Sequence, residues 1–79
     1  MITGTQIRSA RAALGWSAHA LAERSGVSLR TLLRFEQVDR VPPSRSSTLL
    51  DVRRALEAAG IEFIGTPEDA PGIRLRRPR

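Results

Sequence analysis

The chain has 79 residues, a formal net charge of +5 and basic side chains that are all arginine, a balance that favours a polyanionic partner through counterion release. A fold of this length buries only about 60% of its unfolded surface, which limits it to one modest core. The absence of cysteine excludes disulfides and thiolate zinc sites, and no apolar run approaches the roughly 20 residues that span a bilayer.

Residues 4–14 predict the first helix. Thr3 or Thr5 is a candidate for its N-cap, and Gly15 ends it because glycine adopts a positive φ without strain. Apolar side chains recur along the segment at helical spacing: Ile7, Ala10 and Leu14. The segment should therefore bury one face.

Two short helices follow, over about 18–25 and 28–36, joined at Gly26. Gly26 suits a helix end with positive φ, and Ser28 suits the N-cap of the next helix. The inward faces of the pair should carry Leu21, Val27, Leu32 and Phe35. Two short amphipathic helices with a tight corner and a basic second member are typical of a helix-turn-helix, which makes DNA the first partner to test.

Residues 37–47 contain two prolines and three serines, so they predict an ordered connection rather than a helix. Ser46 or Ser47 should cap a fourth helix, which runs to about Ala59 and stops at Gly60. The side chains expected to face inward are Leu49, Val52 and Leu56. No second domain or internal repeat is visible.

Residues 61–64 and 73–76 alternate in polarity and predict two short strands around a loop at 65–72. A lone two-stranded hairpin is marginal in water. The strands must therefore either pack on the helices or pair with a second subunit, and the sequence alone leaves both open.

Two sets of residues carry a family resemblance. The first helix has Ile7, Arg8, Arg11 and Gly15 in the pattern I-R-x-x-R-x-x-x-G. The second set matches the pattern of the two helices and their corner: Leu21, Ala22, Gly26, Val27, Ser28, Thr31, Leu32 and Glu36. The chain thus resembles the Xre or Cro/cI-like family of lambda-repressor-like DNA-binding domains. The resemblance implies a mainly α fold, with four helices in a helix-turn-helix DNA-binding unit at 1–60. Beyond Gly60 the chain departs from the family, which usually continues with another helix, and the alternating segments predict a β-hairpin or dimerisation extension with a basic tail at 61–79.

The resemblance also implies roles for individual residues. Leu29, Arg30 and Arg34 would point toward base edges, while Ser28 and Thr31 would lie near phosphates or bases. Three more residues are expected near the DNA backbone: Ser17, Arg40 and Arg45. The family further implies a partly buried ion pair between Arg11 and Glu36. Many relatives carry glutamine directly after the cap of the second helix, where this chain has Ala18.

The predicted function is a homodimeric transcriptional regulator, a repressor that places helix 28–36 in the major groove of a pseudo-palindromic operator. The rival hypothesis is a small antiactivator or antirepressor of the same fold. It would bind a regulatory protein through Leu29 and Leu33, which form an apolar pair on the outer face of that helix.

Catalysis is not expected. The chain has one histidine, no cysteine and no tyrosine, and it shows neither a glycine-rich phosphate loop nor a metal constellation, so no cofactor or metal is predicted. The last six residues contain four arginines and suggest a basic tail that binds phosphate or simply aids solubility. No leader or membrane segment is recognised, so a cytoplasmic, nucleoid-associated protein is expected.

Overall fold

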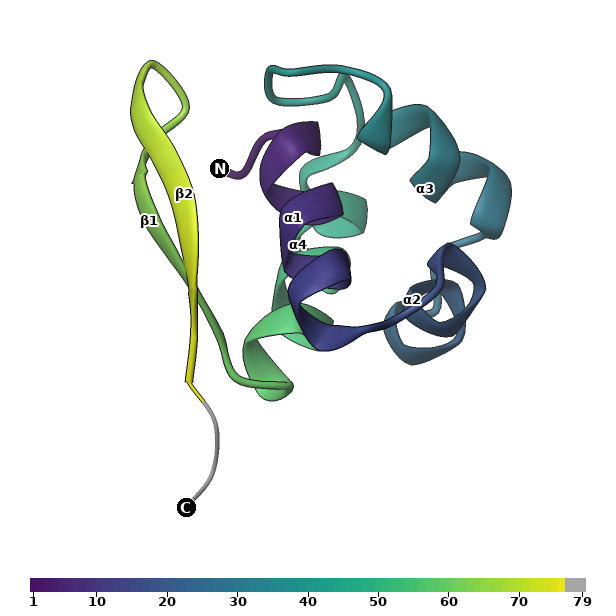
Figure 1. Ribbon diagram of the computed structural model, residues 1–79. Coiled ribbons are helices and arrows are strands. Elements are labelled where there is room, and N and C mark those ends of the chain that lie inside the picture. The colour runs from purple at the N-terminus through teal and green to yellow at the C-terminus, as the bar shows by residue number, and fades with distance from the viewer. Residues whose placement is uncertain (77–79) are drawn as a thin grey trace.

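The computed structural model describes residues 1–76, which form four helices followed by an antiparallel hairpin (Figure 1). The elements are α1 (Gly4–Leu14), α2 (Ala18–Ser25), α3 (Leu29–Glu36), α4 (Ser46–Ala58), β1 (Ile61–Thr66) and β2 (Asp69–Leu75). The predicted mainly α class with a C-terminal strand pair is confirmed. The last three arginine-rich residues of the predicted tail, 77–79, lie outside the described residues.

Local signals explain where the first three helices begin and end. Thr3 caps α1 in a reciprocal capping box with Gln6, while Ser17 and Ser28 cap α2 and α3 by accepting a backbone N–H. Gly15 and Gly26 end α1 and α2 with φ of 69° and 72°, a region that side chains with a Cβ rarely adopt. The predicted corner of the helix-turn-helix is confirmed at Gly26.

The predicted serine cap of α4 is wrong. The N-cap is Arg45, whose side chain makes no capping hydrogen bond, and both Ser46 and Ser47 lie inside the first turn. The backbone carbonyl of Arg45 accepts the N–H groups of Thr48 and Leu49 instead, at 3.1 and 3.2 Å. Leu49 is fully buried. We attribute the start of α4 to this packing and not to a hydroxyl cap.

The core lies between α1 and the other three helices, and the first residue of β1 closes it. The buried apolar side chains are Ile2, Ile7, Ala10, Leu21, Val27, Leu32, Phe35, Leu49, Val52, Leu56 and Ile61. Every inward position predicted for α2, α3 and their corner is buried, as are the three predicted for α4. No helix in residues 1–76 is long and apolar enough to cross a membrane.

The N-terminus of α1 meets the C-terminus of α3 at very short range. The Gly4 N–H donates to the Arg40 carbonyl at 3.1 Å. A Cβ at Gly4 would fall 2.1 Å from the Phe35 oxygen and 2.2 Å from the Val38 oxygen. Only glycine therefore allows α1 to cross this close to the end of α3.

The hairpin is longer than predicted, and its loop is shorter. β1 and β2 pair from Ile61 with Leu75 to Thr66 with Asp69, so the predicted loop at 65–72 shrinks to a turn at Pro67 and Glu68. Gly65, with φ of 73°, sits at a register shift between Ile64 and Thr66, which extends the pairing beyond the alternating segment. Thr66 Oγ1 then accepts the Asp69 N–H at 3.0 Å and closes the turn.

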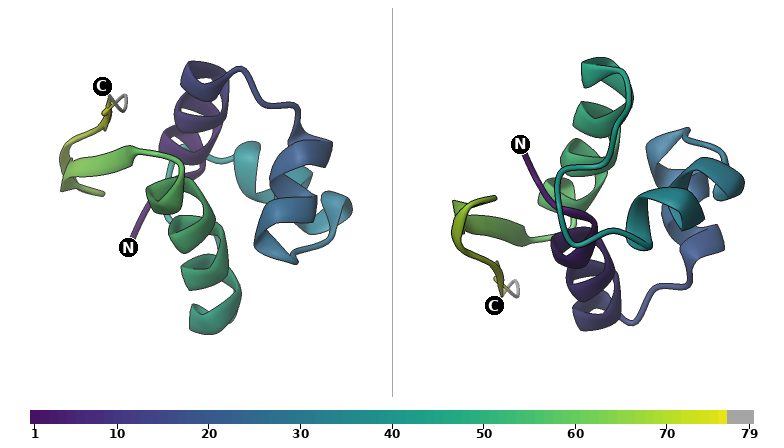
Figure 2. Two further views of the ribbon diagram at one scale, coloured as in Figure 1. Left: turned by 90° about the horizontal axis from the view of Figure 1, so that it is seen from below. Right: turned by 90° about the horizontal axis from the view of Figure 1, so that it is seen from above.

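The hairpin covers the core on the side away from α3, next to α1 and α4 (Figures 1 and 2). Phe63, Ile73 and Leu75 pack against the core, and the guanidinium of Arg53 lies over the Phe63 ring. The structure therefore shows the first of the two predicted roles, which is packing on the helices. Pairing with a second subunit stays a prediction.

Gln6 fastens the hairpin to α1. Its side-chain amide donates to the carbonyls of Ile64 and Gly72, at 3.3 and 2.9 Å, while its oxygen accepts the Thr3 N–H at 2.8 Å. The side chain is only 4% exposed, and both amide protons and the oxygen are used. One buried amide thus joins the start of α1 to both strands.

Replacing Gly4 with alanine should destabilise the fold by about 1–3 kcal/mol or more, because the new methyl group would overlap two backbone carbonyls that cannot move aside independently. At an open helical position the same change would stabilise the chain. Urea unfolding followed by circular dichroism measures the difference, with Ser9→Ala on the exposed face of α1 as the control. A Gly4→Ala variant as stable as the parent would contradict the close crossing.

Gln6→Glu should lower the free energy of unfolding by about 1–3 kcal/mol. The carboxylate keeps the acceptor of the capping box, but it loses both donors and faces two carbonyl oxygens. Gln37→Glu, at an exposed amide, is the matched control in the same urea experiment. Equal effects of the two substitutions would show that the amide does not hold the hairpin.

Candidate nucleic-acid interface

The outer face of α3 is exposed and basic. Arg30 and Arg34 lie four residues apart on this face, and no carboxylate within residues 1–76 is within ion-pair distance of either guanidinium. The helix stands on the far side of the molecule from the hairpin (Figures 1 and 2), so the hairpin does not cover it. Both arginines are therefore free to meet a partner.

Leu29 and Leu33 are on the same exposed part of α3. Their relative exposure is 40% and 46%, so neither leucine is packed against the connection that follows the helix. Leu29 is the first residue of α3, beside Arg30, and Leu33 lies one turn further on. The face thus combines two guanidinium groups with an apolar pair.

The caps of α2 and α3 place hydroxyl groups at the two helix N-termini. Ser17 Oγ accepts the Ala20 N–H at 3.0 Å, and Ser28 Oγ accepts the Thr31 N–H at 3.2 Å. Ser28 also donates its hydroxyl proton to Thr31 Oγ1 at 2.9 Å. The free backbone N–H groups and partial positive charge at a helix N-terminus favour anions such as phosphate.

A groove of about 350 Å³ runs between the end of α3 and the connection to α4. Apolar side chains form most of its walls, and Arg34 and Arg40 also line it. The structure therefore brings Arg34 together with Arg40. Arg45, by contrast, does not line the groove, because it is the exposed N-cap of α4.

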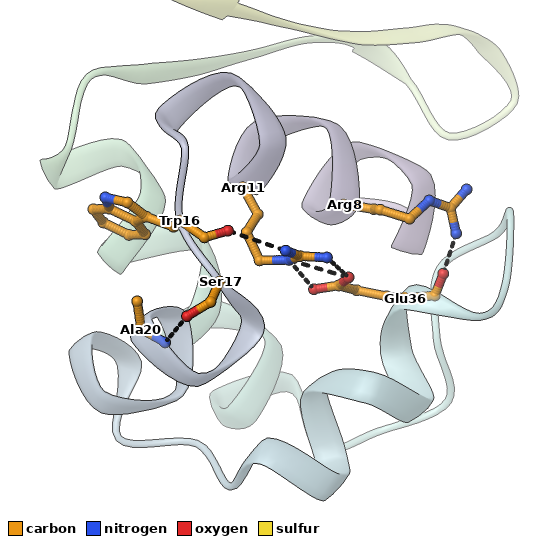
Figure 3. A network of polar contacts seen from close by, with 6 residues as sticks. All are labelled: Arg8, Arg11, Trp16, Ser17, Ala20 and Glu36. Atoms are coloured by element: carbon orange, nitrogen blue, oxygen red, sulfur yellow. Dashed lines mark hydrogen bonds and ion pairs between the residues drawn. The ribbon is translucent and has the colours of Figure 1, made fainter.

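A partly buried ion pair joins α1 to the end of α3 (Figure 3). Arg11 Nε lies 3.2 and 3.0 Å from the two carboxylate oxygens of Glu36, and Arg11 Nη2 lies 2.8 Å from Glu36 Oε1. Arg11 Nη1 donates to the Trp16 carbonyl at 3.0 Å. The Glu36 side chain is 6% exposed, and its hydrogen bond and charge raise the pKa of Arg11 against the opposing effect of burial. The contact that the resemblance implied is thus present.

Arg8 and Asp39 also lie at this junction. Arg8 matches the pattern of the first helix, but no sequence pattern predicted its contacts with the end of α3 or with Asp39. Arg8 donates to the backbone carbonyl of Glu36 (Figure 3). The Arg8 guanidinium also lies 3.6 Å from Asp39 Oδ1. Asp39 also accepts a hydrogen bond from the Thr5 hydroxyl. These contacts satisfy the carbonyl end of α3, where cations are favoured.

Comparison with protein families agrees with this geometry. The family model for a helix-turn-helix domain matches residues 3–62. The chain belongs to the helix-turn-helix domain family. The match covers α1 to α4 and reaches only the first residues of β1, so most of the hairpin lies outside it. A search of curated proteins gave no match.

Membership in the helix-turn-helix family indicates a DNA-binding regulator, and it agrees with the predicted Xre-like resemblance. Among residues 1–76, no three metal-ligating side chains gather in one place. Function in such a domain resides in the exposed side chains.

Arg11→Ala should lower the free energy of unfolding by about 3–5 kcal/mol, because it leaves the Glu36 carboxylate buried without a counter-charge. The raised pKa keeps Arg11 charged, and the stability that it contributes is lost only at strongly alkaline pH, so the deficit should be equal at pH 6 and pH 9. Urea unfolding at both values measures it. In the double variant Arg11→Met, Glu36→Leu the loss should be smaller, and a deficit that is equal in both variants would refute the pairing.

Proposed function

We propose that the chain is a sequence-specific transcriptional regulator that binds a pseudo-palindromic operator as a homodimer, with α3 of each subunit in the major groove. The observation that carries the proposal is the exposed outer face of α3, where Arg30 and Arg34 have no acidic partner among the described residues. A guanidinium group matches the O6 and N7 acceptors of guanine in a bidentate way. Such a protein acts at the nucleoid in the cytoplasm.

The roles divide along α3. Leu29 and Arg30, in the first turn of α3, read base edges, and Leu29 suits a thymine methyl group. Arg34 lies one turn further along α3 and extends the surface that contacts the bases. Ser17, Ser28 and Thr31 bind phosphates or bases near the helix N-termini, and Arg40 and Arg45 add phosphate contacts from the connection. Residues 1–60 form the DNA-binding unit, and residues 61–79 extend it.

Repression is the proposed mode of action. A regulator that occupies an operator blocks polymerase without further machinery, whereas activation needs surface for recruitment. Two α3 helices related by a two-fold axis would contact half-sites about one helical turn apart, near 10 bp. No catalytic step, cofactor or metal is part of this proposal.

Arg30→Ala should weaken binding to the promoter of the chain's own gene by about 10- to 100-fold, since a good base contact is worth about 1–3 kcal/mol. Fluorescence polarisation at fixed salt measures the affinity, with an unrelated duplex of equal length as the nonspecific reference. Arg54→Ala on α4 removes the same charge from another exposed position and serves as the control. Equal losses in the two variants would contradict base reading by Arg30.

A second candidate is an antiactivator or antirepressor that binds a regulatory protein through Leu29 and Leu33. The exposure of both leucines on α3 is the observation that favours it. This hypothesis requires that the chain bind no duplex even at low salt, and that Leu33→Ala abolish capture of the regulatory protein while Arg30→Ala spares it. The regulator hypothesis requires DNA binding that survives Leu33→Ala.

A further inference from the structure

The groove between the end of α3 and the connection to α4 combines an apolar lining with positive charge. The apolar lining is formed by four side chains: Phe35, Val38, Pro42 and Pro43. Phe35 and Pro42 are buried, whereas Arg34 and Arg40, which also line the groove, are exposed. A molecule in the groove would therefore meet apolar side chains and two guanidinium groups together.

The positive charge of the groove is not neutralised by the acidic residues that lie between Arg34 and Arg40 in the sequence. Glu36 pairs with Arg11 of α1. Asp39 contacts the guanidinium of Arg8 and the hydroxyl of Thr5, which also belong to α1. Within residues 1–76 no carboxylate lies within ion-pair distance of Arg34 or Arg40. An anionic group is the charge complement that the groove lacks.

The wall that the connection contributes is held in place without a ligand. Pro42 and Pro43 each have a fixed φ angle. The Arg40 carbonyl accepts the Gly4 N–H at 3.1 Å, which ties the connection to the start of α1. Sites for small molecules are typically of this kind, because they are largely pre-formed and mostly apolar, with a few polar groups that fix orientation.

We propose that this groove binds a small organic anion, a carboxylate with an apolar body about the size of two fused rings. A cavity of about 150 Å³ holds one benzene ring. The groove has about 350 Å³, which suits roughly twice that body. The carboxylate would accept hydrogen bonds from Arg34 and Arg40, and the rings would lie against Phe35 and the prolines.

A DNA backbone would use only part of this groove. Its phosphates are acceptors for Arg34 and Arg40, as the proposed interface requires, but phosphates and sugars offer no apolar group to cover Phe35, Val38 and the two prolines. An inorganic anion would leave the same side chains uncovered. A carboxylate with an apolar body satisfies both parts of the lining.

Occupation of the groove would oppose DNA binding. Arg34 extends the surface proposed to contact bases, and Arg40 is proposed to contact a phosphate. A carboxylate bound to both guanidinium groups takes two cations away from the duplex, so the ligand would act as an inducer that releases the operator. This consequence rests on the proposed function, whereas binding in the groove does not.

The probes that test the site are β-naphthoate and its uncharged isostere β-naphthamide, titrated separately into the full chain and followed by amide NMR. Naphthoate should shift the amide resonances of α3 and the connection saturably. Naphthamide should bind at least about tenfold more weakly, because a charge-assisted hydrogen bond is roughly twice as strong as a neutral one.

Three variants separate the two parts of the lining. The double variant Arg34→Gln, Arg40→Gln should remove the preference for naphthoate, and Val38→Phe should weaken both probes because it fills the apolar part. The control is Arg24→Gln, Arg54→Gln, which removes the same charge outside the groove and should keep the preference. Thermal melts establish that each variant is folded.

The titrations also distinguish this site from a smaller hollow of about 260 Å³ between α2 and α4, which Trp16 and Arg24 line. The Arg24 guanidinium lies 4.4 Å from the centre of the Trp16 ring. Shifts centred on that hollow would overturn the proposal. Equal binding of the two probes, a preference for naphthoate that survives the loss of Arg34 and Arg40, or no saturable binding would overturn it as well.

Competition with DNA is measured separately, by polarisation with the promoter duplex at fixed salt. At ten times its dissociation constant, naphthoate should weaken duplex binding by about tenfold through mass action, and naphthamide at the same concentration should have little effect. Unchanged duplex affinity with the groove occupied would overturn the inducer role. Failure to bind any duplex would count against the proposed function, while the NMR titration, which contains no DNA, decides the groove by itself.

Discussion

The buried contact between Arg11 and Glu36 is the constraint on which the position of α3 depends. Glu36 is the last residue of α3, and its carboxylate is held by Arg11 from α1 while its backbone carbonyl accepts from Arg8. The close crossing at Gly4 brings α1 to the same helix end. Three neighbouring turns of α1 thus fix the C-terminal end of α3. The N-terminal turn, with Leu29 and Arg30, is left outside the core and open to a partner.

Acidic residues pair with some of the arginines and not with others, so the basic charge is unevenly distributed over the molecule. Arg8, Arg11, Arg53, Arg74 and Arg76 each lie within ion-pair distance of a carboxylate. These five arginines belong to α1, α4 and the hairpin. Over residues 1–76 no such pair involves Arg30, Arg34, Arg40 or Arg45, which belong to α3 and the connection after it. These four unpaired guanidinium groups would attract a polyanion toward α3.

Features with local causes could be predicted from the sequence, and features with distant causes could not. Gly26 and Ser28 mark the corner of the helix-turn-helix because each meets a demand of its own backbone position. Gln6 hydrogen-bonds to Ile64, 58 positions away in the sequence, and to Gly72, 66 positions away. No sequence pattern around Gln6 predicts these bonds. The serine cap of α4 failed for the related reason that burial of Leu49 outweighed a local hydroxyl signal. Spacing placed Arg30 and Arg34 on one face of α3, but only the fold shows that Arg34 also lines a groove with Arg40.

The hairpin depends on the helices for its stability. Two strands alone would be marginal in water, and these are stabilised by apolar packing on the core and by the Gln6 amide. The hairpin and α3 lie on opposite sides of α1 and α4 (Figures 1 and 2), so a change at one surface does not touch the other. α1 contacts the hairpin through Gln6 and α3 through Arg11, so coupling between the two surfaces has a direct path through α1.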